Sequence, residues 1–462
     1  MTRGPLRVLV LGWEYPPAVA GGLGAACHGL TTAFAARGNG VHLALPDVCR
    51  PFHEGAEASG KPAAVSEGEA GILSTSFLAT TAGADAGQGQ HHAGVFHPYA
   101  TDERPPDPAE SDGTPRAWGA ASQRLYGADL IDSVRAFTRS AVESLAHLDF
   151  DVIHAHDWMT YPAALQLRLA TRRPACLHVH STAFDRGGSP EVAGQMGLER
   201  GTIASVERAG FRTADAVATV SAYTERVVVE HYGADPARVH VVHNAPSEPS
   251  SEPPSGPIAG SDSRRSRGSA GTGPKTVLFL GRLTRQKGVG FLLRAARVVL
   301  ASHPDARFLI AGEGEERSRL IEAVAELGLA GQVFFLGSIS DEAKVQAYRD
   351  ASVFVLPSVS EPFGLTPLEA LAEGTPVVLS KASGVAEVLP SAPAVEPWDY
   401  VGMAAEISAI LDSSGVPGGL AERLVASGQR EMAQLSWDRS ASALESALAA
   451  AISRGGQALH VR

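Results

Sequence analysis

The sequence has few cysteines, no long apolar run and no excess of positive charge. Its 462 residues include three scattered cysteines, Cys27, Cys49 and Cys176, with no C-x-x-C pair. This set offers no disulfide framework and is typical of a reducing compartment, so we expect a cytoplasmic protein. No apolar run reaches the roughly 18 residues of a membrane-spanning helix. The net charge of -11 argues against a surface for nucleic acids or anionic membranes.

The length of the chain predicts about two or three domains. Its hydrophobic residues, 44% of the total, are enough to form the cores of such domains. The apolar run at residues 6–11 is too short for a signal-peptide core and predicts a first strand. A glycine-rich turn at 20–24, a helix at 25–37 and a strand at 41–45 complete a β-α-β unit. The glycines do not follow the G-x-G-x-x-G spacing, so we predict no dinucleotide site but a backbone that passes close to a ligand phosphate or sugar.

The rest of the first half repeats this pattern and is interrupted by two segments of unusual composition. Residues 50–122 are rich in Gly, Ala, Ser, Pro and Glu, and we interpret them as an insertion with flexible loops and a hairpin of strands at 72–78 and 94–99. His91 and His92 in this insertion suit a solvated loop better than a metal site. Residues 246–274 read as a flexible linker. Further helices are predicted at residues 121–148 and 161–170, and strands at 151–158, 175–182, 216–220 and 239–244.

The second half contains a second set of alternating strands and helices. A basic loop, residues 282–288, follows the first strand of this set and leads into a helix at 289–302. We therefore predict domains at 1–245 and 275–435, with residues 436–462 as a C-terminal helix. The strands are predicted at 276–281, 307–311, 333–336, 353–356 and 376–380, and the last helices at 403–411, 420–435 and 437–452.

The most informative stretch is residues 358–370, which joins a buried strand to the start of a helix. Pro367 suits the first helical turn, and Gly364 lets the backbone approach a ligand. Free N–H groups and the helix dipole would make this an anion site. Two carboxylates, Glu361 and Glu369, flank it and are better suited to sugar hydroxyls than to phosphate. An ordinary β-α unit with solvated acids is the alternative.

Charged and polar groups recur at the predicted carboxyl ends of strands, where open α/β sheets bind their ligands. Arg282 and Lys287 suit a diphosphate. His180, Asp157 and the Gly21–Gly22 pair follow strands of the first half. Together these groups indicate a nucleotide-sugar site in a cleft between two doubly wound domains.

The pattern resembles the retaining glycosyltransferases of the GT-B fold, in glycosyltransferase family 4, and the related bacterial glycogen and starch synthases. The resemblance implies two Rossmann-like domains that face each other across a cleft, with a C-terminal helix, from Ser436–Trp437 onward, returning to the first domain. It covers nearly the whole chain, in the family's order. The matching segments are Gly21–Leu23, His154–Trp158, His178–His180, Gly281–Leu283, Lys287–Gly288, Glu361–Leu365 and Glu369.

By this resemblance, Arg282 and Lys287 bind the donor diphosphate, and Glu369 holds the ribose. Glu361 contacts the transferred sugar, and His180 lies near its anomeric carbon. The remaining residues that it assigns to donor binding are Gly21, Gly22, Gly364, Leu365 and Thr366, and those on the acceptor side are Asp157, Tyr15 and Ser221.

The implied reaction is transfer of a hexose from a nucleoside diphosphate sugar to a glycan or small-molecule acceptor, with retention of configuration. The fixed cations stabilise the leaving diphosphate. The resemblance implies front-face attack, in which the leaving phosphate helps to deprotonate the acceptor, so no protein nucleophile is expected. It also implies no metal or cofactor. Asp149–Asp151 has the form of a D-x-D metal motif. That motif belongs to another glycosyltransferase fold, however, and Asp151 begins a buried strand, so we expect no metal there. We expect no nucleic-acid partner and no integral membrane segment. The sequence does not decide whether the protein forms a homo-oligomer.

Three features of the sequence differ from the starch-synthase pattern, and other functions therefore have to be considered. Ala20 replaces a lysine, Asn244–Pro246 replaces Asn-Gly-Val, and Ser383–Glu387 is closer to family 4. Glycogen-like elongation of an α-glucan therefore stays the alternative to a small acceptor. A nucleotide-sugar epimerase of the same fold is a further alternative. A metal-dependent hydrolase using the histidines of residues 154–180 would leave the second half unexplained.

Overall fold

The computed structural model describes residues 4–16, 18, 21–49, 71–78, 125–126, 129–187, 198–246 and 274–459. The described chain divides into two compact units. The first contains the residues up to Ala245 together with those from Ser436 onward, and the second ends at Leu435. In the part of the chain described, no helix is both long and apolar enough to cross a lipid bilayer.

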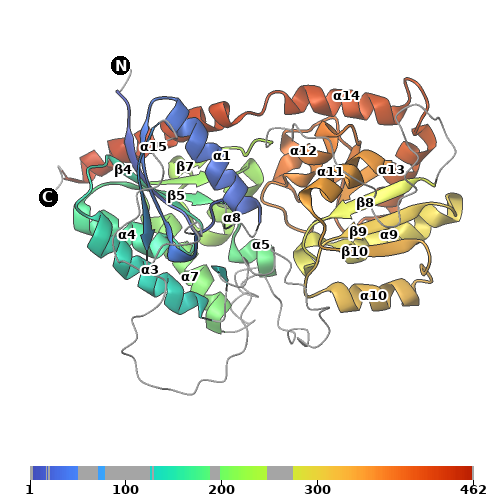
Figure 1. The fold of residues 1–462 in the computed structure, drawn as a ribbon, viewed down its shortest axis with the longest axis horizontal. Helices are drawn as coiled ribbons and strands as arrows, with labels where there is room; N and C mark the ends of the chain where they lie inside the picture. Colours follow the sequence, from blue (N-terminus) through green and yellow to red (C-terminus); the bar gives the residue numbers. More distant parts are fainter. Residues whose placement is uncertain are drawn as a thin grey trace, which may run out of the picture. The chain divides into compact units, whose positions relative to one another are not determined.

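The first unit is built on a seven-stranded parallel sheet (Figure 1). Its order is β3-β2-β1-β4-β5-β6-β7, so the direction of progression reverses between β1 and β4, which is where open α/β sheets bind ligands. The central strands are buried on both faces, as their continuous apolar runs predict. The strands are β1 (Arg7–Leu11), β2 (Gly40–Pro46), β3 (Ile72–Leu78), β4 (Val152–His156), β5 (Ala175–Val179), β6 (Ala216–Thr219) and β7 (Val239–Val241).

Helices pack on this sheet in two groups. Helix α4 packs on β4 and β5 and contacts both α3 and α7, whereas α15 packs on α1 and on β4 to β7. The helical segments are α1 (Gly22–Ala36), η1 (Asp47–Cys49), α3 (Leu130–Leu145), α4 (Tyr161–Thr171), α5 (Ala183–Gly187), α7 (Leu198–Thr213), α8 (Ala222–Tyr232), η3 (Pro236–Arg238) and α15 (Trp437–Leu459).

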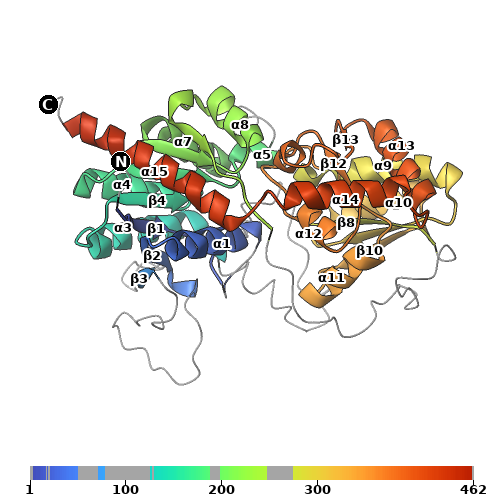
Figure 2. The ribbon, with the colours of Figure 1, turned by 90° about the horizontal axis from the view of Figure 1, so that it is seen from above.

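Helix α15 follows the second unit in sequence but is part of the first (Figure 2). Trp437 packs on α1 at Gly29, where a Cβ atom would lie 2.4 Å from the indole ring. Arg37, just after α1, bonds to Asp438 at 2.7 Å and to Glu445 at 3.0 Å. The indole ring packed on Gly29 and the contacts of Arg37 with two carboxylates together fix the position of α15 along α1.

The second unit contains a six-stranded parallel sheet in the order β10-β9-β8-β11-β12-β13. Alternate residues of its strands, such as Val277 and Phe279 of β8, pack with α9 and α13 in one core. The strands are β8 (Thr276–Leu280), β9 (Arg307–Ala311), β10 (Val333–Gly337), β11 (Val353–Leu356), β12 (Val377–Ser380) and β13 (Ala394–Val395). The helical segments are η4 (Arg285–Lys287), α9 (Val289–Ser302), α10 (Arg317–Glu326), α11 (Asp341–Asp350), α12 (Thr366–Ala372), η5 (Gly384–Glu387), α13 (Tyr400–Ser413) and α14 (Leu420–Met432).

The predicted α/β fold with two Rossmann-like halves is confirmed, although several elements differ in detail. Residues 72–78 form the expected strand, but it is the edge strand β3 of the main sheet and pairs in parallel with β2. Its middle residues, Ser74–Ser76, are polar and only partly buried, which suits an edge strand. Its expected hairpin partner at 94–99 lies outside the described residues, as do His91 and His92. The helix expected from residue 121 begins at Leu130.

Candidate functional site

Loops after three neighbouring strands of the second unit are packed backbone against backbone. Gly288 has a φ of 64°, and a Cβ atom there would lie 2.1 Å from the carbonyl oxygen of Pro357. A Cβ atom at Gly312 would lie 1.9 Å from the carbonyl oxygen of Gly281. Only glycine fits such positions. They bring the loop after β8, which contains the partly buried Arg282, against the loops after β9 and β11.

The loops after β8 and β11 are joined by a buried ion pair. Nζ of Lys287 lies 2.5 Å from Oε2 of Glu361, and Oγ of Ser358 donates to the same oxygen at 3.1 Å. The side-chain amide of Gln286 donates to the carbonyl oxygen of Ser360 at 2.9 Å. An ammonium group has three N–H donors, so Lys287 keeps donors for a second anion while it holds Glu361.

The glycine-rich turn after Glu361 leads directly into α12. Gly364 has a φ of 102°, and Leu365 is the N-cap of the helix that starts at Thr366. The first N–H groups of a helix have no partner within it and favour an anion. The carbonyl oxygen of Glu361 accepts from the N–H of Gly384 at 2.9 Å, so the loop after β12 supports this turn.

The second carboxylate of the stretch, Glu369, is held by α11. Its Oε2 accepts from the hydroxyl of Tyr348 at 2.8 Å, and Nζ of Lys344 lies 3.4 Å from its Oε1. Burial, together with the Glu369 charge, holds the pKa of Tyr348 well above its ordinary value. The phenol therefore stays a hydrogen-bond donor and fixes the carboxylate in one orientation.

In the first unit, four histidines lie on β4 and β5 or directly after them. Nε2 of His154 lies 3.1 Å from Nδ1 of His178, and Nδ1 of His156 lies 2.9 Å from Nε2 of His180. The rings of His178 and His180 are stacked, with centroids 4.5 Å apart. This arrangement follows from register, because His156 and His178 are direct partners in the β4–β5 pair.

All four imidazoles are neutral at physiological pH. Burial lowers the pKa of His154 and of His180 to about 3, and lowers the pKa of His156 and of His178 well below its ordinary value. Neutral imidazoles can bind a metal ion. His156 belongs to two groups whose possible ligand atoms lie within 4.8 Å of one another. The first group contains His154 and His178, and the second contains Cys27 and His180. The rings, however, bond to each other in pairs, and those of His156, His178 and His180 lie nearly parallel, whereas the ring of His154 is tilted by 58° from that of His156. Such ring planes do not point their lone pairs at one centre, so this geometry favours hydrogen-bonded pairs.

Asp157 holds the backbone of the segment that carries His180. Its Oδ1 accepts from the N–H groups of His180 at 2.7 Å and of Ser181 at 3.4 Å. The residue has a φ of 58°, which is uncommon outside glycine and marks a constrained turn. Burial raises the pKa of this carboxyl to about 7.

A second buried carboxylate supports the start of α5 just beyond this segment. Both oxygens of Glu207 accept from the N–H of Ala183 at 3.0 Å, and Nη2 of Arg186 lies 3.2 Å from Oε1. Burial raises the pKa of Glu207 to about 7. The loop after β5 is thus held by two carboxylates, that of Asp157 at His180 and Ser181 and that of Glu207 at Ala183.

The remaining predicted residues of the first unit have structural contacts. The N–H of Gly21 donates to Oε2 of Glu14 at 3.1 Å, and Gly22 begins α1. The ring of Tyr15 meets His28 edge-on at 5.2 Å. Ser221 is fully buried and caps α8, since its Oγ accepts from a backbone N–H of that helix. This capping role is one that the sequence analysis did not foresee.

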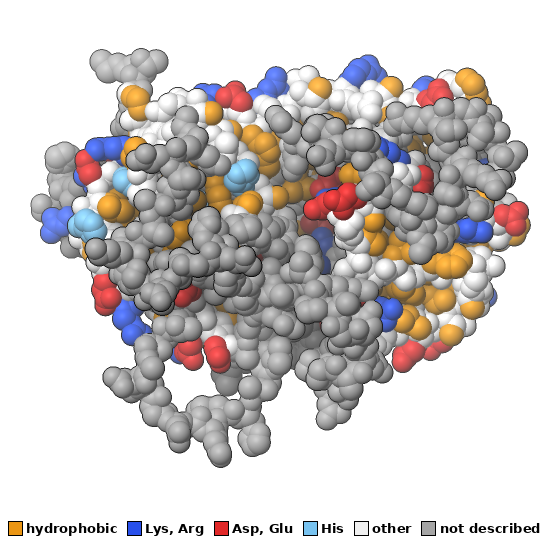
Figure 3. Space-filling model, viewed as in Figure 1, with side chains coloured by type: hydrophobic (Ala, Val, Ile, Leu, Met, Phe, Trp, Pro, Cys, Tyr) orange, Lys and Arg blue, Asp and Glu red, His pale blue; other side chains and the backbone are white. Residues whose placement is uncertain are grey.

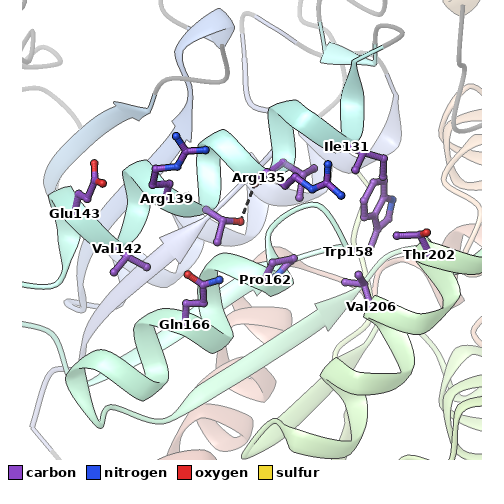
Figure 4. A pocket seen from close by; sticks show the side chains of 12 residues that line it. Ile131, Arg135, Arg139, Val142, Glu143, Trp158, Pro162, Gln166, Thr202 and Val206 are labelled. Atoms are coloured by element: carbon purple, nitrogen blue, oxygen red, sulfur yellow. Dashed lines mark hydrogen bonds between the residues drawn. The ribbon is translucent and has the colours of Figure 1, made fainter. Parts of the chain in front are cut away.

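A groove on the first unit lies away from these residues (Figure 4). It runs between α3, α4 and α7 and is lined by apolar side chains and by Arg135, Arg139 and Gln166, with Trp158 at one end. None of the predicted site residues lines it. Described side chains of both signs are interspersed on the face in Figure 3.

Within each unit, the structure brings together residues that the sequence predicts separately. Lys287 meets Glu361, and Asp157 meets the His180 segment. The sequence analysis missed the supporting partners Ser358 and Tyr348, which carry no motif signal. The sequence analysis also missed the close backbone packing at Gly312 and Gly314. The signal was a G-x-G pattern directly after a predicted strand.

Comparison with known proteins identifies the family. The model described as starch synthase catalytic domain matches residues 7–239, and the model described as glycosyl transferases group 1 matches residues 262–428. The chain is similar to the glycogen synthase of Mycobacterium tuberculosis (strain ATCC 25618 / H37Rv), with 28% identity over 95% of this chain and 93% of that protein. It is 31% identical to a D-inositol 3-phosphate glycosyltransferase of Geodermatophilus obscurus, over 68% of this chain and 70% of that protein.

Among solved structures, the catalytic domain of starch synthase IV from Arabidopsis thaliana, bound to ADP and acarbose, superposes with a TM-score of 0.61 at 18% identity, over 97% of this chain and 100% of that chain. The superposed residues include parts of both units. The starch synthase model alone covers half of the chain, and the group 1 model covers most of the second unit. The chain therefore belongs to the glycosyltransferases of the starch synthase and group 1 type, with the GT-B fold.

Proposed function

We propose that the protein transfers a hexose from a nucleoside diphosphate sugar to an acceptor hydroxyl, with retention of configuration, as in glycosyltransferase family 4. The observation that carries the proposal is the cluster after β8 and β11, where Lys287, Glu361 and the Gly364 turn converge. It offers cations and backbone N–H groups for a diphosphate and a fixed carboxylate for sugar hydroxyls.

Each group has a role in breaking the anomeric bond. Arg282 and Lys287 stabilise the negative charge that develops on the leaving diphosphate, and one such contact is typically worth about 3–4 kcal/mol in the transition state. Glu361 contacts the transferred sugar and Glu369 binds the ribose. His180 contacts the sugar near its anomeric carbon.

Retention needs no protein nucleophile in this proposal. The acceptor attacks from the face that the diphosphate leaves, and the leaving phosphate oxygen accepts the acceptor's proton. No metal is required, because Arg282, Lys287 and the start of α12 supply the compensating charge. Turnover that is unchanged in EDTA would support this, whereas loss in EDTA that Mg²⁺ or Mn²⁺ restores would contradict it.

Two acceptor classes are supported by specific relatives. The match to a D-inositol 3-phosphate glycosyltransferase favours a small polar acceptor, which we put first. The match to a glycogen synthase over 95% of the chain favours elongation of an α-glucan as the second candidate. The relatives named above are transferases, and none is an epimerase.

The test is a binding screen followed by turnover. Calorimetry with UDP, GDP, ADP and TDP identifies the nucleotide, and its sugar derivatives are then incubated with inositol phosphates or with malto-oligosaccharides. NMR of the product anomeric proton reports the configuration. An inverted product would refute retention, and a rearranged sugar nucleotide formed without acceptor would refute transfer.

A further inference from the structure

The His156–His180 pair leaves one polar atom of each ring without a partner. The bonded atoms are Nδ1 of His156 and Nε2 of His180, 2.9 Å apart. Nδ1 of His180 and Nε2 of His156 are buried and have no hydrogen-bond partner among the described residues. A buried polar atom without a partner requires an explanation, and a role in catalysis is one of the usual ones.

The environment fixes both the position and the charge of the His180 ring. His156 is completely buried, and the His180 backbone is anchored by Asp157. His178 stacks on the His180 ring on one side. The ring therefore has one engaged nitrogen, Nε2, and one buried nitrogen, Nδ1, whose hydrogen-bonding capacity is not used by the described residues.

Two neutral imidazoles that share one hydrogen bond have linked tautomers. If Nδ1 of His156 carries the shared proton, His180 carries its own proton on Nδ1 and presents a donor. If Nε2 of His180 carries it, Nδ1 of His180 presents an acceptor. The bond to His156 thus couples the tautomer of His180, and with it the role of Nδ1 as donor or acceptor, to the tautomer of His156.

We infer that His156 is a positioning residue for the transfer reaction, which holds the His180 ring with Nε2 occupied and Nδ1 facing the substrate in a single tautomer. This rests on the proposed function, in which His180 contacts the transferred sugar. His156 does not touch the substrate; it acts through His180.

The chain offers a matched set of variants. Asparagine places its amide where the Nδ1 atom of histidine lies, so His156→Asn keeps the bond to His180. Glutamine places its amide where Nε2 lies, so His156→Gln loses that bond while burying a similar polar group. His154→Leu is the control, because it removes a buried imidazole of the same group of four histidines whose bond is to His178.

The kinetic experiment measures kcat and the donor KM with the nucleotide sugar that gives turnover. We expect His156→Gln to lower kcat about tenfold, the size of one lost hydrogen bond, with little change in KM. His156→Asn should recover most of kcat, and His154→Leu should remain near wild type. Equal losses in His156→Asn and His156→Gln, or an equal loss in His154→Leu, would overturn the inference.

A second readout needs no substrate. Long-range ¹H–¹⁵N spectra of histidine-labelled protein should show His180 as one neutral tautomer in the wild type and in His156→Asn, and as a mixture in His156→Gln. The same tautomer in all three proteins would overturn the inference. If His180→Ala keeps full turnover, the role of His180 in the proposed function fails, even when the spectra show the bond. If His180→Ala is inactive but both His156 variants behave alike, only this inference fails.

Discussion

The ammonium group of Lys287 lies 2.5 Å from a carboxylate oxygen of Glu361, although 74 residues separate the two in the chain. Their side chains are only 17% and 10% exposed. A pair with so little solvent around it retains most of its mutual attraction, and removal of one partner leaves the other charge buried without compensation. The two residues therefore act as one unit, which joins the loops after β8 and β11.

The first prediction concerns this coupling. Lys287→Met and Glu361→Gln should each lower kcat about 100-fold or more, because each removes a fixed charge near the reacting groups. The double variant should lose much less than the product of the single losses, because both single changes break the same pair. Steady-state kinetics of the four proteins measure this coupling.

The control for this cycle is Arg285→Met in the same turn. Arg285 is an exposed cation that pairs with Glu316 at 3.3 Å. Exposed pairs contribute little, so kcat and KM should stay near wild type. Strictly multiplicative losses in the Lys287 and Glu361 variants would show that the two residues act separately.

The second prediction concerns the orientation of Glu369. Tyr348→Phe keeps the ring that packs edge-on against Phe354 at 5.7 Å but removes the hydroxyl that donates to Glu369. The donor KM should rise about fivefold with kcat nearly unchanged, because a ribose contact stabilises ground state and transition state alike. Glu373→Gln is the control, since Glu373 bonds to Arg349 at 2.6 Å. A lower kcat at constant KM would place Glu369 in the chemical step instead.

The sequence predicted the strands well because their apolar runs are continuous and short. Val353–Leu356 and Arg307–Ala311 lie where the pattern placed them. The two-residue strand β13 was missed, because so short a strand has no period to detect.

Motif spacing placed the charged groups at strand ends but could not show which of them touch. The bond between Lys287 and Glu361 depends on the close approach of Gly288 to Pro357, a tertiary contact. The pairing of His156 with His180 depends on the parallel register of β4 and β5. Neither property is local, so neither can be read from the residues nearby.

The third prediction tests that close approach. Gly288→Ala places a methyl group 2.1 Å from a backbone oxygen at a φ of 64°, so it should lower the free energy of unfolding of the second unit by about 2 kcal/mol or more. Gly290→Ala is the control, with no atom within 4 Å of its new Cβ, and should raise stability by up to about 1 kcal/mol through helix propensity. Urea denaturation compares the two. Equal stability of both variants would show that the loops separate easily.

The fourth prediction is that the first unit loses stability as the pH falls below about 6.5. The folded-state pKa of His154 and of His180 is about 3, against an ordinary value of 6.5. Between these values the unfolded chain binds more protons, so the free energy of unfolding decreases on acidification. Asp157 and Glu207 act in the opposite sense, because their pKa values of about 7 lie above their ordinary values of 3.8 and 4.5.

The histidines dominate this balance, since four imidazoles with lowered pKa values oppose two carboxyl groups with raised ones. Urea denaturation at several pH values measures the slope with which the free energy of unfolding changes with pH. The range from about pH 7.5 to about pH 5 brackets the ordinary histidine pKa. His154→Leu should reduce that slope by about 1.4 kcal/mol per pH unit, the effect of one proton. Asp157→Asn should steepen it, because it removes an opposing group. A stability that rises below pH 6.5 would mean that the histidine stack admits protons while folded.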